Sequence, residues 1–506
     1  MYENGKIYMG LAGDKRVELA LNMCNRHGLI AGASGTGKTV TMKVMAESFS
    51  DAGVPVSLCD VKGDVAGICA PGQSSEGMEK RIDKFGLRDR FVYQGYPTTF
   101  WDVYQEGGHA VRATVSDMGP ELLSRILGLT AVQEGILHIV FQIADDKGLL
   151  LIDLKDLRAM LTYVSEHRTE YMMTYGNITS QSVAAILRAL LPLEQQGGEL
   201  FFGEPALDIR DWMRTAADGR GMINVLDCVK LVQNPTLYAS FLLWMLSELF
   251  EILPEAGDLD KPRMVFFFDE AHMLFRSAPA VLLQKVEQTV KLIRSRGVGV
   301  YFVTQSPSDI PDIVLAQLSN RVQHALRAYT PTELKAVRAA ARAFRPNPAF
   351  QAEDAIMELG VGEALTSFLD EAGVPAMVER TKIICPQSLM SVPEPMVRAK
   401  VMMHDGMEKY DEFVDNVSAY EVLTAEREEA ETAKQEEADR KAREKEEAQA
   451  EKLRLKEEEA ERKRKQKLED EARRKAERRA AKIESQLISA GGQVLKRGLL
   501  GVLKKW

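Results

Sequence analysis

The residues whose types and spacing most clearly imply chemistry are Gly-Ala-Ser-Gly-Thr-Gly-Lys-Thr at positions 32–39. A Gly-x-x-x-x-Gly-Lys-Thr loop wraps a polyphosphate in backbone N–H groups, and its lysine reaches the outer phosphates. We therefore predict that Lys38 contacts the β- and γ-phosphates of a nucleotide and that the Thr39 hydroxyl coordinates Mg²⁺. The predicted nucleotide-binding residues are Gly32, Ala33, Ser34, Gly35, Thr36, Gly37, Lys38, Thr39 and Val40.

Two adjacent carboxylates supply the second half of this chemistry. Residues 263–272 read RMVFFFDEAH, an apolar strand that runs into Asp269 and Glu270. Adjacent acids at a buried strand end are costly without a cation or a proton as partner. We expect Asp269 to hold the Mg²⁺ that Thr39 also contacts, and Glu270 to polarise the water that attacks the γ-phosphate. ATP and Mg²⁺ are therefore the expected cofactors.

Further polar residues fit the same reaction. Gln305 follows a strand-like segment at 298–303 and is predicted to touch the γ-phosphate or the attacking water. A cation at the transition state comes either from the same subunit or from a neighbour, and Arg294, Arg296 and Arg321 are the candidates. The sequence leaves open for each arginine whether it acts there or only in a surface ion pair.

These residues need a scaffold that brings strand ends together. Apolar runs predict strands that alternate with helices, an arrangement typical of a mostly parallel sheet covered on both faces. Polar groups at the carboxyl ends of such strands face the ligand crevice. Asp60 and Asp64 fit that crevice, and they fit an ordinary turn equally well. The predicted strands are 27–31, 54–60, 221–229, 263–269 and 299–304, and the predicted helices between them are 40–50, 235–253 and 279–296.

The fold class we predict is α/β with an all-helical insertion and a long charged C-terminal helix. Helical periodicity marks the insertion at 121–129, 131–145, 154–167 and 180–191. We divide the chain into a hairpin and the first part of the core (1–116), the insertion (117–200), the second part of the core (201–395), a linker (396–420), the charged helix (421–482) and a basic amphipathic tail (483–506).

The last 86 residues differ in composition from the rest. Glu, Lys, Arg and Ala dominate 421–482, and opposite charges recur three or four residues apart, as in a solvated helix. A coiled coil needs sustained apolar positions, which this stretch lacks apart from a few leucines, so an isolated helix is favoured over a coiled coil. The tail is interrupted by Gly491 and Gly492. Its apolar and basic residues could bind a membrane surface, a protein partner or the chain's own core. Binding to a protein partner or to the core is favoured, because the tail is short and broken by glycines.

The composition further limits which classes of protein the chain can belong to and in which compartment we expect it. The 506 residues carry a formal net charge of −9, which argues against a broadly basic surface that coats nucleic acid without selection, while a basic channel within an oligomer stays open. The five cysteines are scattered and show no metal-binding spacing, as suits a reducing compartment. No signal peptide or membrane-length apolar run is evident, so we expect a cytoplasmic protein.

The motifs together resemble a known family. The segments GASGTGKT, VSLCDVKGD, FFFDEAHMLF, RSRGVGVYFVTQSPSDIP and LSNRVQHALRA occur in this order and resemble the HerA/FtsK class of hexameric P-loop ATPases, most closely the bacterial HerA-like proteins. The resemblance covers roughly residues 20 to 390. It implies a RecA-like P-loop NTPase core and a homo-oligomeric, hexameric ring. The DEAH string alone would also suggest a superfamily-2 RNA helicase, but the other sequence blocks of those enzymes are not evident.

Matched residue by residue, the resemblance assigns Lys38 and Thr39 to Walker A, Asp269 and Glu270 to Walker B, and Gln305 to the sensor. Arg296 or Arg321 would be the arginine finger. The chain departs from DNA-pumping members of the class, because only a short hairpin at 6–21 precedes the P-loop and the charged helix lies outside the shared core.

Two functions follow from these residues. The leading hypothesis is an ATP hydrolase whose ring moves a polymer, with DNA as the expected partner. The alternative is a nucleotide-switched scaffold, in which the C-terminal helix recruits a protein or a membrane surface.

Overall fold

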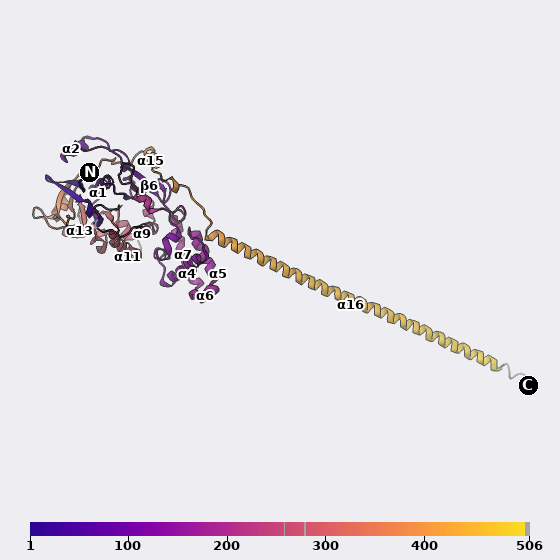
Figure 1. The fold of residues 1–506 in the computed structure, drawn as a ribbon. Coiled ribbons are helices and arrows are strands. Elements are labelled where there is room, and N and C mark those ends of the chain that lie inside the picture. Colours follow the sequence, from indigo (N-terminus) through magenta and orange to yellow (C-terminus); the bar gives the residue numbers. More distant parts are fainter. Residues whose placement is uncertain (258, 278–279, 501–506) are drawn as a thin grey trace, which may run out of the picture. The chain divides into compact units, whose positions relative to one another are not determined.

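A computed structural model describes residues 1–257, 259–277 and 280–500, and its elements are drawn in Figure 1. The chain divides into two units, Met1–Leu423 and Thr424–Trp506. The first unit is built on one sheet that contains 13 strands within the described ranges. The strands are β1 (Tyr2–Glu3), β2 (Lys6–Ala12), β3 (Lys15–Ala20), β4 (Gly28–Ala31), β5 (Val56–Asp60), β6 (Thr98–Asp102), β7 (His109–Ala110), β8 (Ile223–Asp227), β9 (Met264–Phe268), β10 (Val298–Thr304), β11 (Asn320–His324), β12 (Glu363–Ser367) and β13 (Glu379–Ile383).

The centre of the sheet is parallel. Strands β11, β4, β10, β9, β5, β8, β6 and β7 lie side by side in this order, and each neighbouring pair is parallel. Strand β4, which leads into the predicted nucleotide loop, therefore has β10 on one side and β11 on the other. The strand β9 that carries the acidic pair is separated from β4 by β10 alone. The mostly parallel α/β fold is thus confirmed.

Side-chain alternation along β9 explains why helices cover both faces of the sheet. Phe266 and Phe268 belong to one hydrophobic cluster together with Trp244 of α9. Val265 and Phe267 belong to a second cluster, with α1 on the opposite face. Successive side chains of a strand point to opposite faces, so a continuously apolar strand requires cover on both. The helices of the core are α1 (Lys38–Asp51), α2 (Glu76–Lys84), α9 (Pro235–Ile252), α10 (His272–Ser277), α11 (Ala280–Ile293), α12 (Asp312–Leu315), α13 (Pro331–Arg342), α14 (Ala352–Glu358) and α15 (Pro395–Met402).

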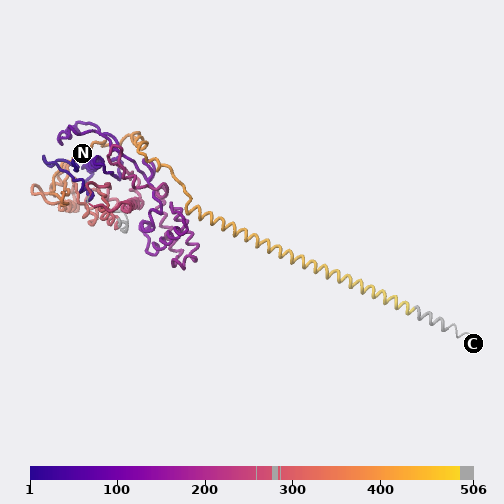
Figure 2. The backbone as a smooth tube through the Cα atoms, viewed as in Figure 1, coloured from indigo at the N-terminus to yellow at the C-terminus, as the bar shows by residue number. Residues whose placement is uncertain are grey.

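An antiparallel layer extends the sheet beyond β11. Strands β12 and β13 follow β11 antiparallel, β2 adds to β13, and β1 and β3 pair with β2. The predicted N-terminal hairpin is β2 with β3, and it completes the edge made by the last strands of the core. Figure 2 traces these two segments, which lie far apart in the sequence, beside each other.

The helical insertion forms as predicted between β7 and β8. Its first two helices begin with capping boxes, in which the side chain of Thr114 or Thr130 and the residue three positions on satisfy each other's backbone N–H groups. One helix that the sequence analysis did not separate, α6, follows α5 directly. The insertion comprises α3 (Val115–Ile126), α4 (Ala131–Lys147), α5 (Leu154–Glu166), α6 (Arg168–Tyr175), α7 (Ser180–Leu193) and α8 (Glu199–Phe201).

The C-terminal helix α16 spans Ala419–Leu500. It begins two residues before the predicted start at Glu421, and its backbone stays helical through Gly491 and Gly492, where the sequence analysis placed an interruption. Residues 425–489 are exposed throughout, as expected for a solvated charged helix. Across the described ranges, no helix combines the length and the apolar character that crossing a membrane requires.

Candidate active site

The glycine-rich loop joins β4 to α1 at the carboxyl edge of the parallel strands. Gly37 adopts a φ of 115°, which side chains disfavour, and α1 begins at the next residue, Lys38. A Cβ atom at Gly32 would lie 2.5 Å from the Cβ of His324 on β11. The glycines therefore let the loop turn tightly against the neighbouring strand and leave the N-terminus of α1 directed at a bound anion.

Lys38 is folded back onto the loop. Its Nζ atom donates to the carbonyl oxygen of Gly32 at 2.8 Å and to that of Ala33 at 3.2 Å, and only 6% of the residue is exposed. Burial lowers the pKa of Lys38, while the charges of Glu270 and Asp269 act in the opposite direction. The ammonium group thus lies inside the loop, where a phosphate oxygen can take the place of the two carbonyls.

His324, at the end of the neighbouring strand β11, lies against the nucleotide loop, and the sequence analysis did not assign it a role. Its Nδ1 atom donates to the carbonyl oxygen of Glu363 at 2.9 Å, and its Nε2 atom accepts from the Thr41 hydroxyl at 2.8 Å. Burial lowers its pKa to about 4, so the imidazole is neutral, with Nδ1 as its donor and Nε2 as its acceptor. Its position at the end of β11, in the segment LSNRVQHALRA, was the only sequence signal for this role.

The acidic pair lies at the end of β9. Glu270 is 4% exposed and has a φ of 46°, a left-handed conformation that is strained for a residue other than glycine. Its backbone N–H donates to Oδ1 of Asp269 at 2.9 Å. Burial, together with the negative charge of Glu270, raises the pKa of Asp269 to about 7. The two carboxylates are buried next to each other, which is electrostatically unfavourable unless a cation lies nearby. This arrangement is expected of a metal site.

The residues present fit a magnesium ion. Oδ2 of Asp269 and Oδ1 of Asp64 are buried and have no hydrogen-bond partner among the described residues. The Thr39 hydroxyl donates to Oδ2 of Asp64 at 3.5 Å, so loop and acids meet here. Within the described ranges, no three His, Cys, Asp or Glu side chains form a metal cage of their own. Mg²⁺ commonly uses one or two carboxylates and completes its shell with water and substrate phosphates, as this arrangement allows.

Glu270 is held by groups from two neighbouring strand ends. Lys62, after β5, forms an ion pair with its Oε1 atom, and the Gln305 side-chain amide, after β10, donates to Oε2 at 3.3 Å. Nδ1 of His272 lies 3.1 Å from Oε2. Burial alone would raise the pKa of Glu270, but the hydrogen bond and charge of Lys62, with the Gln305 amide and His272, outweigh it and lower the pKa. The Glu270 carboxylate is therefore ionised.

Comparison with known families decides the class of this site. A family model described as helicase HerA-like C-terminal matches residues 8–506. The chain belongs to this HerA-like family. None of the curated proteins compared with the chain matches it.

Solved structures share the fold of this HerA-like chain. The unbound monoclinic form of the bacterial conjugative coupling protein TrwBdeltaN70 is 14% identical with a TM-score of 0.53, over 78% of this chain and 92% of that one. The plasmid coupling protein TrwB in complex with ADP and Mg²⁺ is 13% identical with a TM-score of 0.50, over 77% and 93%. VirB4 of Thermoanaerobacter pseudethanolicus is 17% identical with a TM-score of 0.48, over 78% and 99%. At these identities the likeness to the two TrwB structures shows the P-loop ATPase fold alone.

The two acids after β5 in the HerA-like chain have different surroundings. Asp60 accepts from the backbone N–H groups of Gly63 at 2.7 Å and Val65 at 3.1 Å, so it stabilises the turn. Burial and the charge of Asp64 raise the pKa of Asp60 to about 6. Asp64 instead faces the Thr39 hydroxyl. The two roles that the sequence left open are thus divided between the two residues.

The candidate finger arginines do not reach the nucleotide loop of their own chain. Arg294 and Arg296 form a short turn before β10, at the end opposite the loop, and the Arg296 guanidinium lies 4.5 Å from the centre of the Phe250 ring. Arg321, on β11, donates to the carbonyl oxygens of Leu318 at 3.0 Å and Leu315 at 3.2 Å. A finger role for Arg296 or Arg321 stays a prediction, and it requires a second subunit.

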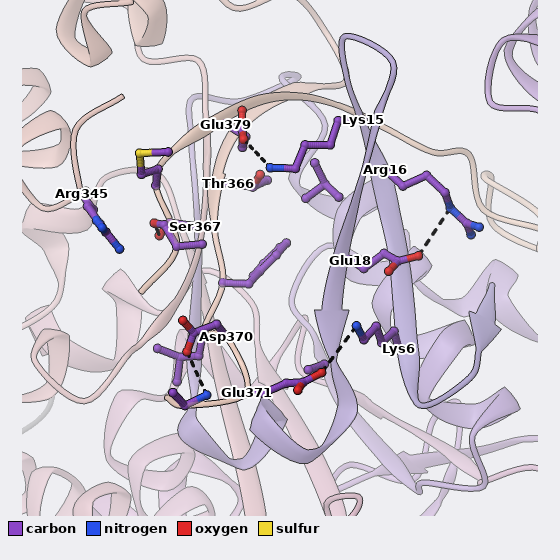
Figure 3. Close-up of a pocket in the computed structure, with 17 residues that line it drawn as sticks. Lys6, Lys15, Arg16, Glu18, Arg345, Thr366, Ser367, Asp370, Glu371 and Glu379 are labelled. Atoms are coloured by element: carbon purple, nitrogen blue, oxygen red, sulfur yellow. Dashed lines mark hydrogen bonds and ion pairs between the residues drawn. The ribbon is translucent and has the colours of Figure 1, made fainter. Parts of the chain in front are cut away.

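A separate groove of about 730 Å³ lies between the β2–β3 hairpin and the strands β12 and β13 (Figure 3). Lys15 reaches across it to Glu379 at 2.8 Å, and Lys6 lies 3.8 Å from Glu371. Since these charges are already paired, the groove does not share the chemistry of the nucleotide loop.

Proposed function

We propose that this HerA-like chain hydrolyses ATP and, assembled as a homo-oligomeric ring, uses the turnover to move DNA. One observation carries the hydrolysis: Glu270 is a buried, ionised carboxylate that is hydrogen-bonded to Gln305 and lies beside Asp269. A chain that only bound nucleotide would have no need of a strained, ionised base next to a second buried acid. Family membership and the fold shared with a conjugative coupling protein support the ring and the DNA.

The residues divide the reaction among them. The backbone N–H groups of residues 32–39 and the Lys38 ammonium bind the phosphates, while Thr39 and Asp269 hold the metal with Asp64 beside them. When bound, Mg²⁺ neutralises charge on the phosphate oxygens. Gln305 orients the attacking water, and Glu270 accepts its proton at Oε1 or Oε2.

The substitution Glu270→Gln tests the hydrolysis. It keeps the shape and the contact with Gln305 but removes the proton acceptor, so kcat should fall by about 10²- to 10⁴-fold while ATP binding persists. Glu371→Gln, an exposed acid in the groove, is the matched control and should leave turnover unchanged. Phosphate release at saturating ATP measures both variants. Undiminished turnover in Glu270→Gln would reject the proposal.

A second function is favoured by the exposure of α16. The 65 residues at 425–489 are exposed throughout and thus are free to contact a partner. In this version, the nucleotide state sets the conformation of the core and α16 recruits a protein or a membrane surface. Removing α16 separates the two functions, because the core would keep its nucleotide site and lose the recruiting helix.

A further inference from the structure

Lys62 contacts the Glu270 carboxylate, although the sequence analysis did not assign it to the reaction. It follows β5, and β5 pairs in parallel with β9, so that Cys59 lies opposite Phe268. The turn fixed by Asp60 then places Lys62 over the end of the neighbouring strand. There its Nζ atom forms an ion pair with Oε1 of Glu270.

The exposure of the two partners is unequal. The side chain of Glu270 is 4% exposed, whereas that of Lys62 is 45% exposed. The ammonium group therefore covers the solvent side of the base. A nucleotide bound by the loop, with the attacking water between its γ-phosphate and Glu270, has to approach the carboxylate from the side that faces the loop, within reach of this ammonium.

The charges around Lys62 favour an ammonium that exchanges partners. Burial alone would lower the pKa of Lys62, but the hydrogen bond and charge of Glu270, with the charges of Asp269 and Asp64, raise it, so the group is cationic. The charge of Lys62 in turn contributes to lowering the pKa of Lys38. Two ammonium groups thus influence the same small volume, and the attraction of an added phosphate for both would relieve their mutual repulsion.

We propose that Lys62 is a catalytic residue that moves from the Glu270 carboxylate to the γ-phosphate when ATP binds. This inference rests on the proposed hydrolysis. The Nζ···Oε1 ion pair is exchanged for an ion pair between Nζ and a γ-phosphate oxygen, and no proton or covalent bond changes hands. The exchange frees Oε1 of Glu270 to accept the proton of the attacking water, and it adds a positive charge where negative charge is held in the transition state.

The side chain and its surroundings suit this exchange. Lysine carries a compact charge on a flexible four-carbon stem, so one rotation of the stem can redirect it. The carboxylate does not depend on Lys62 for its orientation, because the Gln305 amide donates to its other oxygen, Oε2. ADP lacks the γ-phosphate, so ADP should leave the Lys62–Glu270 ion pair in place. The device therefore distinguishes ATP from ADP within a single subunit.

The experiment compares the affinities of the full-length chain for a non-hydrolysable ATP analogue and for ADP, both with Mg²⁺, by calorimetry. Lys62→Ala should weaken the analogue by about 10- to 100-fold, as expected for the loss of a charge-assisted hydrogen bond, and leave ADP unchanged. Lys62→Arg keeps the cation and should restore part of this selectivity. Lys15→Ala, which removes an exposed lysine paired with Glu379, is the matched control and should change neither affinity.

Several results would overturn the proposal. An equal loss of affinity for both nucleotides in Lys62→Ala would mean that Lys62 has only a structural role in the site. Unchanged selectivity together with faster hydrolysis in Lys62→Ala means that Lys62 merely blocks the base. Failure of the proposed hydrolysis is seen separately, as wild-type chain that binds the analogue but releases no phosphate; the affinity ratio of Lys62→Ala still decides the role of Lys62 in that case.

Discussion

Two buried histidines are neutral in the folded chain. Nε2 of His27 donates to the Val290 carbonyl at 2.8 Å and its Nδ1 accepts from the Val300 N–H at 3.0 Å, an arrangement like that of His324 with Glu363 and Thr41. Burial lowers the pKa of both rings to about 4. A proton added to His27 would place a donor against the Val300 N–H, whereas at His324 the Thr41 hydroxyl can turn to accept, so burial is what keeps His324 neutral. Both imidazole rings therefore stay neutral while the central strands are folded.

The free energy of unfolding should reflect this. Between about pH 6.5 and pH 4 the unfolded chain binds a proton at His324 that the folded chain excludes, so this residue's contribution to stability falls as the pH falls. The destabilisation caused by His324→Gln should therefore be smaller at pH 4.5 than at pH 7.5, by roughly 2.5 kcal/mol. Urea unfolding at the two pH values measures the difference.

The comparison with His324→Gln cancels the buried acids, whose raised pKa values act in the opposite direction. His404→Gln is the control, because His404 is exposed and bonds only to the Lys400 carbonyl within its own helix region. A pH-independent effect of His324→Gln would mean that the imidazole titrates normally in the folded chain.

At the scale of elements, the first turn of α16 is anchored to the helical insertion through one carboxylate. Oδ1 of Asp156 accepts from the Ser418 hydroxyl at 2.5 Å and the Tyr420 N–H at 2.9 Å. Its Oδ2 accepts from the N–H groups of Ile152 at 2.8 Å and Asp153 at 3.0 Å. Asp156 thus caps α5 and holds the start of α16 at once.

Asp156→Ala should loosen this junction. The residue is 1% exposed, and its loss leaves the backbone N–H groups of Ile152, Asp153 and Tyr420 without this acceptor, while the Ser418 hydroxyl keeps Glu421, so we expect a fall of about 3 kcal/mol in the free energy of unfolding. Amide hydrogen exchange in the segment 414–423 should also quicken. Glu166→Ala, an exposed position on the same helix, is the control for both readouts. Unchanged exchange at Tyr420 would show that the junction is held by other contacts.

Elements that carry the motifs could be predicted because each is an apolar run that ends in polar residues. The strands β9 and β10 are such runs, and both lie close to their predicted bounds. The strand β13 was missed, since its sequence ERTKI alternates polar and apolar residues and resembles an exposed segment. Pairing between β13 and the N-terminal hairpin joins residues more than 360 positions apart, and no local pattern reports such a contact.

Some residues of the site could also be predicted from the sequence. The motif spacing identified Lys38, Thr39, Asp269 and Glu270. The contact between Lys62 and Glu270 depends on how two adjacent strands are aligned, so the sequence alone did not indicate it.

Most of α16 is a charged, exposed helix, and among its described residues only the first turn packs in the hydrophobic core. Residues 421–461 hold 16 acidic and 9 basic side chains, and residues 462–482 hold 4 acidic and 11 basic ones. The charge along α16 thus changes from net negative to net positive. Pairs such as Lys441 with Glu437 at 2.7 Å and Lys463 with Glu459 at 2.7 Å add local support. Such a helix needs no partner to be stable, and in a parallel, in-register pair its like charges would face each other.

Truncation after Leu423 tests what α16 does. The chain 1–423 keeps all four site residues and the Ser418 anchor, so we expect it to fold, to hydrolyse ATP at a kcat within about twofold of the full chain, and to form the same oligomer. Light scattering with and without a non-hydrolysable ATP analogue measures assembly, and phosphate release with added duplex DNA over a salt series measures stimulation. Glu371→Gln in the full chain controls for a change of surface charge.

The outcomes separate the two functions. A ring stimulated by DNA in both chains supports the motor, and α16 then acts as an addition to it. Retained hydrolysis without DNA stimulation in either chain favours the scaffold, whose partner binding the truncation should abolish. Loss of the oligomer on truncation would make α16 a connection between subunits, and a monomer under every condition would remove the basis for an arginine finger acting across an interface, because Arg296 and Arg321 do not reach the loop of their own chain.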